Sequence, residues 1–262
     1  METLVDAANH GRTELLRTLI NNKANLEAKD PLRNRTALIW AALNGHSECL
    51  QLLIDAKADL FFTALMWAAV NDHLTCLERL IDGNADLEAR DTDDNTALIW
   101  AASCANIRCT RLLVDSKANL EARQIEGNTA LTWATRGEDS ECVRLLLNAQ
   151  ANIETRDDEG NTALIFAAGC QENTELLQLL LNMKADIHTH GSEGNALMFA
   201  AKNGRIACVK LLLDVNADIE SQNNDGLTAL MCAASAGETE CAQLILEVIS
   251  QRYNVFHTTG VH

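Results

Sequence analysis

The heptapeptide Thr96-Ala-Leu-Ile-Trp-Ala-Ala102 decides the fold, because it recurs along the chain with few changes. It returns as Thr36-Ala-Leu-Ile-Trp-Ala-Ala42 and, with one substitution, as Thr63-Ala-Leu-Met-Trp-Ala-Ala69. Related phrases begin at Thr129, Thr162, Asn195 and Thr228. The first alanine of each small pair marks the period: Ala7, Ala41, Ala68, Ala101, Ala134, Ala167, Ala200 and Ala233. Successive markers differ in residue number by 34, then by 27, then five times by 33, and such self-similarity is typical of stacked repeats.

Each unit has the pattern of two helices. The small pair lies in a short first helix, because residues without bulk let neighbouring helices approach closely. After a break that often holds glycine, a leucine-rich segment such as Leu50-Gln-Leu-Leu-Ile54 places apolar residues at i, i+3 and i+4 on one face. A phrase such as Ala118-Asn-Leu-Glu121 and a polar turn close the unit. One unit cannot bury its own apolar face, so neighbouring units must stack.

These units resemble the ankyrin repeat family, whose period is about 33 residues and whose phrase is T-P-L-H-x-A. The resemblance covers nearly the whole chain in about eight units. It implies an all-α solenoid of helix-turn-helix units with projecting β-hairpin or turn fingers. Two departures are systematic. Alanine replaces the proline of the phrase at Ala37, Ala64, Ala97, Ala130, Ala163, Ala196 and Ala229. The histidine is replaced at Ile39, Met66, Ile99, Thr132, Ile165, Met198 and Met231.

The repeats predict a solenoid over residues 1–249 and a C-terminal tail over residues 250–262. The expected units span about 1–30, 31–60, 61–90, 91–123, 124–156, 157–189, 190–222 and 223–249. Asp6 stands where later units have an aromatic residue, which suits a terminal unit whose outer face meets water. We therefore expect Met1 to be a true start, and we expect the tail to be mobile or bound to a partner.

The short step between Ala41 and Ala68 reflects the loss of six residues from the projecting loop. Leu60-Phe-Phe-Thr63 stands in place of the longer connection of the other units. Two explanations are open. The finger is truly short, with Phe61 and Phe62 packing into the joint, or a disordered stretch is missing from the sequence. On a short loop, the same two phenylalanines could also form an apolar contact for a partner.

The composition of the chain excludes some classes of partner and indicates a cellular compartment. Asp and Glu outnumber Lys and Arg 37 to 21, and the formal charge of -16 repels nucleic acids and anionic membranes. No apolar run reaches the roughly 20 residues that cross a bilayer, and the N-terminal residues lack the pattern of a secretory signal. Nine cysteines without C-x-x-C pairing favour a reducing, cytoplasmic location. We expect no nucleic-acid partner and no membrane insertion.

Cysteine recurs at one place of the second helix: Cys49, Cys76, Cys109, Cys142, Cys208 and Cys241. Equivalent positions in stacked helices lie about 8–10 Å apart, whereas a disulfide needs Cα atoms within about 7 Å and zinc needs sulfurs at about 2.3 Å. We therefore expect these six to be buried apolar spacers. Cys104 and Cys170, at the ends of first helices, are the expected exposed thiols.

An aromatic residue recurs at one place of the first helix: Trp40, Trp67, Trp100, Trp133, Phe166 and Phe199. We expect a buried ladder between stacked helices. The alternative is an aromatic stripe on the concave face that grips a partner helix or peptide. His188 and His190 are spaced like metal ligands but lack further ligands nearby, and His46 and His73 suit a structural role. No catalytic or phosphate-binding motif occurs, so we expect no enzyme, catalytic residue, metal, cofactor or small-molecule substrate.

The ankyrin resemblance implies that partners meet the finger tips and the concave surface of the first helices. The finger candidates are Asp93, Ile125, Glu126, Asp158, Glu159, Glu193 and Asp225, and the candidates where first helices end are Leu43, Val70, Arg136 and Lys202. Phe61 and Phe62 join them at the short connection. Because most tips are acidic, we expect a partner protein with a basic segment and an apolar anchor near Leu43 and Val70. The sequence thus favours an interaction scaffold; the alternative is a structural subunit of a larger cytoskeletal or ciliary assembly.

Overall fold

The computed structural model describes residues 2–59, 61–170 and 174–258, with the backbone alone at residues 61, 62 and 253–258. The chain forms two compact units, residues 1–125 and 126–262. In the described ranges the regular structure is helical, apart from isolated β-bridges between Lys29 and Thr36 and between Gly191 and Gly194. The expected all-α class is therefore confirmed, and the described fingers are turns with at most one bridge.

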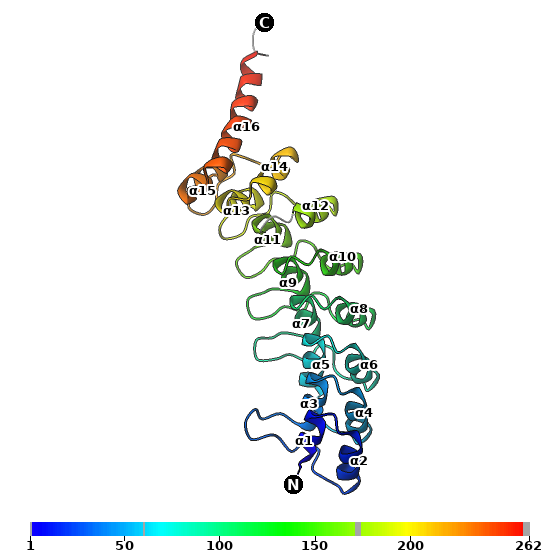
Figure 1. Cartoon of the computed structure of the whole chain (residues 1–262). Coiled ribbons are helices and arrows are strands. Elements are labelled where there is room, and N and C mark those ends of the chain that lie inside the picture. Colours follow the sequence, from blue (N-terminus) through cyan, green and yellow to red (C-terminus); the bar gives the residue numbers. More distant parts are fainter. Residues whose placement is uncertain (1, 60, 171–173, 259–262) are drawn as a thin grey trace. The chain divides into compact units, whose positions relative to one another are not determined.

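Unit 1 contains four helix pairs (Figure 1). The pairs are α1 (Leu4–Asn9) with α2 (Thr13–Asn21), α3 (Ala37–Leu43) with α4 (Ser47–Asp55), α5 (Phe61–Val70) with α6 (Leu74–Asp82), and α7 (Ala97–Ser103) with α8 (Ile107–Asp115). Successive odd-numbered helices contact one another, and so do successive even-numbered helices. We call the odd-numbered helices inner and the even-numbered helices outer.

Unit 2 repeats this arrangement with four further pairs. The pairs are α9 (Ala130–Arg136) with α10 (Ser140–Asn148), α11 (Ala163–Gly169) with α12 (Thr174–Asn182), α13 (Ala196–Lys202) with α14 (Ile206–Asp214), and α15 (Ala229–Ala236) with α16 (Thr239–Thr258). Inner helices again contact the next inner helix, and outer helices the next outer helix. The last helix, α16, continues past residue 250 to Thr258.

The inner helices follow directly from the recurring heptapeptide. Its threonine is the N-cap, as where the hydroxyl of Thr96 accepts a hydrogen bond from the backbone N–H of Ile99, and such caps contribute about 1 kcal/mol. Ala101 and Ala102 are at most 1% exposed, so neighbouring helices can approach closely. The leucine of the phrase, such as Leu98, is also buried; burying one such side chain stabilises the fold by roughly 1.5–3 kcal/mol.

The outer helices α4 to α14 are each followed, two residues after the last helical residue, by a residue in a left-handed conformation. These positive φ angles fall at Lys57, Asn84, Lys117, Gln150, Lys184 and Asn216. Lysine at φ 63° or 70° is strained relative to glycine, by about 1–2 kcal/mol. The N–H of the next residue bonds back to the helix, as from Ala118 to the carbonyl of Leu113 at 3.0 Å. Backbone hydrogen bonding and packing thus hold a turn that the side chain disfavours.

Polar side chains form hydrogen bonds between successive repeats. The ring of His73 lies 3.0 Å from the carbonyl oxygen of Leu43 in the preceding repeat, and Asn106 donates to the carbonyl of Val70 at 2.9 Å. Gly45 sits beneath the His73 ring at φ 72°, where a Cβ would approach the ring to 2.7 Å. The structural role expected for His73 and His46 is confirmed, because His46 makes the same contact with Asn9.

The six recurring cysteines are buried, as expected. Burial raises the pKa of the Cys109 thiol to about 12 and that of Cys76 to about 11, which keeps both thiols neutral. The expectation for the other two cysteines is half wrong, since Cys104 is exposed but Cys170 is buried. The Cys170 thiol lies 3.4 Å from the carbonyl oxygen of Phe166, where the chain leaves α11 in an extended conformation rather than a turn.

The short connection changes where α5 begins. The other inner helices that carry the heptapeptide begin at its first alanine, such as Ala37 or Ala97, but α5 begins three residues earlier, at Phe61. Thr63 is therefore inside the helix instead of capping it, and its buried hydroxyl oxygen has no hydrogen-bond partner in the described residues. Residues that elsewhere form the base of a finger thus extend an inner helix here. The side chains of Phe61 and Phe62 lie outside the described part of the chain.

Candidate functional site

The aromatic residues of the inner helices are half-exposed, not buried. All six have intermediate exposure: Trp40, Trp67, Trp100, Trp133, Phe166 and Phe199. The expected buried ladder is therefore wrong, and the alternative of an aromatic stripe agrees with their exposure. The reason is helical periodicity: Trp100 and Ser103 are three residues apart and share a face, while Ala97, Leu98 and Ile99 turn into the core.

Two of the tryptophans are fixed by a finger aspartate. The indole Nε1 of Trp40 donates to Oδ2 of Asp30 at 3.0 Å, and that of Trp100 donates to Oδ2 of Asp91 at 2.8 Å. Desolvation opposes ionisation of Asp30, but hydrogen bonds from the backbone N–H groups of Arg33 and Arg35 and from Trp40 lower its pKa to about 2. The Trp40 indole therefore stands beside a carboxylate that stays charged at neutral pH.

Arginine fills the space between successive aromatic rings at two places. The guanidinium carbon of Arg35 lies 5.2 Å from the ring centre of Trp40 and 4.4 Å from that of Trp67. The guanidinium carbon of Arg136 lies 5.2 Å from the ring centre of Trp133 and 4.9 Å from that of Phe166. All four distances fall within the range of cation–π attraction, which extends to about 6 Å. The aromatic stripe therefore already binds guanidinium groups of its own chain.

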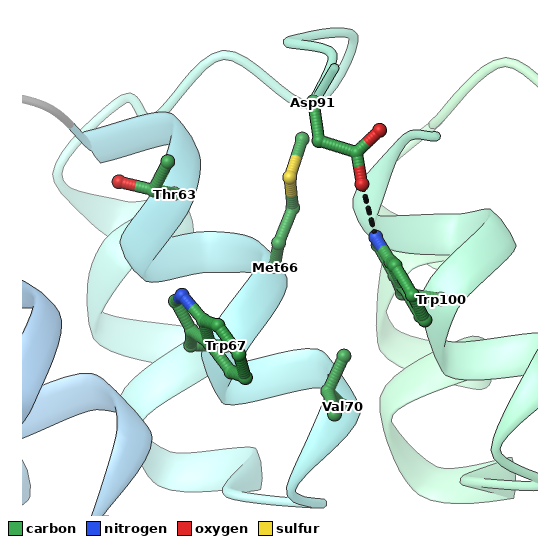
Figure 2. A pocket seen from close by; sticks show the side chains of 6 residues that line it. All are labelled: Thr63, Met66, Trp67, Val70, Asp91 and Trp100. Carbon is green, nitrogen blue, oxygen red and sulfur yellow. Dashed lines mark hydrogen bonds between the residues drawn. The ribbon is translucent and has the colours of Figure 1, made fainter. Parts of the chain in front are cut away.

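A pocket of about 170 Å³ opens between α5 and α7. Its lining residues are Thr63, Met66, Trp67, Val70, Asp91 and Trp100. Figure 2 shows Trp67 projecting from α5 and Trp100 from α7, with Met66 and Val70 between them and Asp91 bonded to the Trp100 indole. Among the described residues the lining is mostly apolar and includes one carboxylate and no basic residue. It can enclose a flat or apolar group of a ligand.

The finger tips are exposed and bonded to one another within each unit. The backbone N–H of Ile125 donates to the carbonyl of Asp93 at 3.1 Å in unit 1. In unit 2 the N–H of Asp158 donates to the carbonyl of Glu126 at 3.0 Å, and Ser192 donates to that of Glu159 at 2.7 Å. Ile125 has 58% of its surface exposed. The structure thus holds neighbouring acidic tips in a fixed row within each unit.

The remaining predicted residues are dispersed among four settings. Lys202 and Glu193 form an ion pair at 2.9 Å, and Asp225 is exposed on a turn whose backbone bonds to Asn223. Leu43 and Val70 are half-exposed, and their carbonyl groups bond to the following repeat. Arg136 points its guanidinium between two rings. Of these, Val70 lies in the pocket.

No metal-binding cluster occurs among residues 2–59, 61–170 and 174–258: no three His, Cys, Asp or Glu side chains gather there. His190 instead contacts the hydroxyl of Ser221 at 2.8 Å through Nε2. In the same part of the chain no helix combines the length and the apolar character needed to span a bilayer.

Sequence reasoning missed half of the residues that line the pocket. It named Val70 and both tryptophans, but not Met66, Thr63 or Asp91 as lining residues. One signal was available, because an aspartate precedes the tryptophan by nine or ten residues at Asp30 and Asp91. Gln124 takes that place before Trp133, whose Nε1 has no hydrogen-bond partner in the described chain.

Comparisons with known proteins agree with the repeat architecture. A family model of ankyrin repeats, built of three copies, matches residues 4–91, 61–124, 118–190 and 170–256. The E3 ubiquitin-protein ligase XBAT33 of Arabidopsis thaliana is 39% identical over 51 residues, which cover 20% of this chain and 10% of that protein. This chain thus matches a small part of the length of that relative.

Proposed function

The chain belongs to the ankyrin-repeat family, and we propose that it is a scaffold that holds a partner protein on its finger tips and on the exposed face of its inner helices. Ankyrin repeats mediate protein–protein interaction, and stacked repeats provide the extended surface for it. The proposal assigns no catalysis to the chain. It also takes no ligase activity from the Arabidopsis relative, because the shared segment is short.

The observation that carries the proposal is the row of acidic finger tips. Glu126, Asp158 and Glu159 are exposed, and the backbones of neighbouring tips are hydrogen-bonded. A fixed row loses little conformational entropy when a partner binds, so its charges can be used for recognition. Negative charge in a row attracts a basic segment and speeds its association. The proposed partner is therefore a protein that offers a basic segment.

We further propose a reducing, cytosol-like compartment. The chain has nine free cysteines, eight of them buried. Buried neutral thiols are compatible with a fold that does not depend on disulfides. Labelling of free thiols in the protein taken directly from its source cells tests this point. Substantial oxidation of Cys104, the exposed thiol, would contradict it.

The experiment for the scaffold compares two charge-reversed variants. The test variant carries Glu126→Lys, Asp158→Lys and Glu159→Lys at the tips. The control carries Asp82→Lys, Asp115→Lys and Asp214→Lys at the last residues of α6, α8 and α14, which are also exposed. Both variants change the net charge equally. Partners are captured from source cells with each variant and with the wild type, and association rates are measured over a range of salt concentrations.

We expect the tip variant to lose partners that the wild type and the control retain. For these partners the association rate should fall about tenfold or more at low salt, and its salt dependence should flatten. Equal capture by all three proteins, or equal loss in both variants, would contradict a role for the finger tips.

A further inference from the structure

Two pairs of successive inner helices have aromatic residues at equivalent positions but differ in the residue that stands between the rings. We call the space between Trp67 and Trp100, lined by Val70, the open joint, and the space between Trp133 and Phe166, occupied by Arg136, the filled joint. Val70 and Arg136 both follow their tryptophan by three residues. The filled joint therefore shows which group fits between consecutive rings of this stripe.

The open joint has the size for such a group. Its volume is about 170 Å³, and a cavity of about 150 Å³ accommodates a benzene-sized ligand. Valine is too short to reach across the space that the Arg136 side chain crosses in the filled joint. The indole of Trp100 is held in place by Asp91, so one wall of the open joint is fixed before a ligand arrives.

The negative charge of Asp91 favours a cation as the ligand of the open joint. Desolvation acts against the charge on Asp91, but hydrogen bonds from the Asn95 backbone and the Trp100 indole outweigh it and lower its pKa. The carboxylate is therefore ionised at neutral pH. No basic residue of the described chain lines the open joint to neutralise it. Two indole rings and a carboxylate in one lining favour a planar cation over a neutral apolar group.

We propose that the open joint binds the guanidinium group of an arginine side chain presented by a partner protein. Arg35 and Arg136 each lie over two consecutive aromatic rings, and the open joint also has an aromatic residue on both sides but no basic residue of the described chain in its lining. This inference deepens the scaffold function proposed above and rests on it for the source of the arginine. Within unit 1 it also places an anchoring contact beside one acidic tip, since Asp91 and the tip residue Asp93 belong to one finger.

The test uses an arginine derivative, N-acetyl-arginine methylamide, with no partner protein. Its neutral isostere, the citrulline derivative, is the control ligand. Binding is followed by the four tryptophan indole N–H signals in nitrogen-edited NMR spectra, each assigned with a single Trp→Phe variant. We expect saturable shifts of the Trp67 and Trp100 signals with millimolar affinity, at least tenfold weaker binding of the citrulline derivative, and little change at Trp40 and Trp133. Equal binding of the two derivatives, shifts of all four signals, or no shift would overturn the proposal.

A pair of variants separates the open joint from general charge effects. Val70→Arg should place its own guanidinium between the rings, as Arg136 does, and abolish the shifts caused by the arginine derivative. Thr75→Arg, at an exposed position of the outer helix α6, adds the same charge away from the lining and should leave the shifts unchanged. Arginine occurs naturally at this position in α9, so Val70→Arg should fold. Persistence of the shifts in Val70→Arg would contradict the proposed site.

The two proposals can fail separately. If the arginine derivative binds but the tip variant still captures every partner, the finger-tip function is wrong and the arginine site stands. If partners depend on the tips but the derivative does not bind, the open joint is not an arginine site.

Discussion

The open joint and the filled joint show how two repeats with the same stacking pattern differ in the residue between their aromatic rings. Both have a tryptophan on the exposed face of the inner helix and an aromatic residue in the following repeat. In the filled joint Arg136 lies between the rings, and in the open joint Val70 leaves a pocket. The repeats share a core but differ in surface lining. A repeat protein can therefore change what it binds without changing how it stacks.

The largest expected effect on stability comes from truncating a buried leucine, which tests whether the hydrophobic cores at the two joints are equivalent. Leu98 of α7 and Leu164 of α11 occupy the same position and are each 1% exposed. Replacing either by alanine should destabilise the protein by about 3 kcal/mol, because both the buried surface and the packing around it are lost. Urea unfolding of the two variants measures this. If their losses differ by more than the spread of about 2 kcal/mol that such truncations show, the two joints differ in their cores as well as in their lining.

The second-largest effect is expected for a substitution that converts the filled joint into an open one. Arg136→Val should lower the free energy of unfolding by about 1 kcal/mol, because an exposed cation–π contact with two rings is lost. The variant should also bind the arginine derivative at Trp133, which we do not expect of the wild type. Thermal unfolding and the Trp133 indole signal are the measurements. Arg136→Lys is the matched control, and an unchanged Trp133 response in Arg136→Val would show that Val70 alone does not explain the open joint.

A smaller effect concerns the finger aspartate of the open joint. The pKa of Asp91 is lowered from its ordinary value of 3.8, so its carboxylate stabilises the fold above about pH 3.8 and loses this effect as the pH falls through the lowered pKa. Asp91→Asn should therefore be less stable than the wild type at pH 7, by less than about 1 kcal/mol because the group is near solvent. The difference should shrink as the pH is lowered below the ordinary value. The midpoints of urea unfolding of both proteins at neutral and acidic pH measure this difference in stability. A difference that does not change with pH would show that the charge of Asp91 contributes nothing.

The smallest expected effect on stability is that of a substitution at Cys104, which we compare with Cys170; the two cysteines directly follow α7 and α11. Only Cys104 is exposed, so iodoacetamide at pH 8 should modify one thiol quickly and the buried thiols slowly. Burial raises the pKa of Cys170 to about 11, which keeps it protonated at that pH. Cys104→Ser should remove the fast phase and change stability by less than about 0.5 kcal/mol. A fast phase that survives in this variant would mean that Cys170 is accessible.

The stacking of the helix pairs could be predicted because the sequence repeats. Ala101 and Leu98 recur with their period in every central unit, and each recurrence is independent support for the same buried face. Exposure of the aromatic stripe could not be read in this way. A recurring tryptophan fits a buried ladder and an exposed stripe equally well.

The sequence by itself determined the helix pairs, their number and their order. Hydrophobic periodicity and capping residues are local properties, and they recur in every repeat. Only the tertiary structure decided which aromatic rings are exposed, that Cys170 is buried, and that Val70 borders a pocket while Arg136 fills the corresponding space. Those facts depend on distances between side chains about 33 residues apart. Such distances follow from how neighbouring repeats pack.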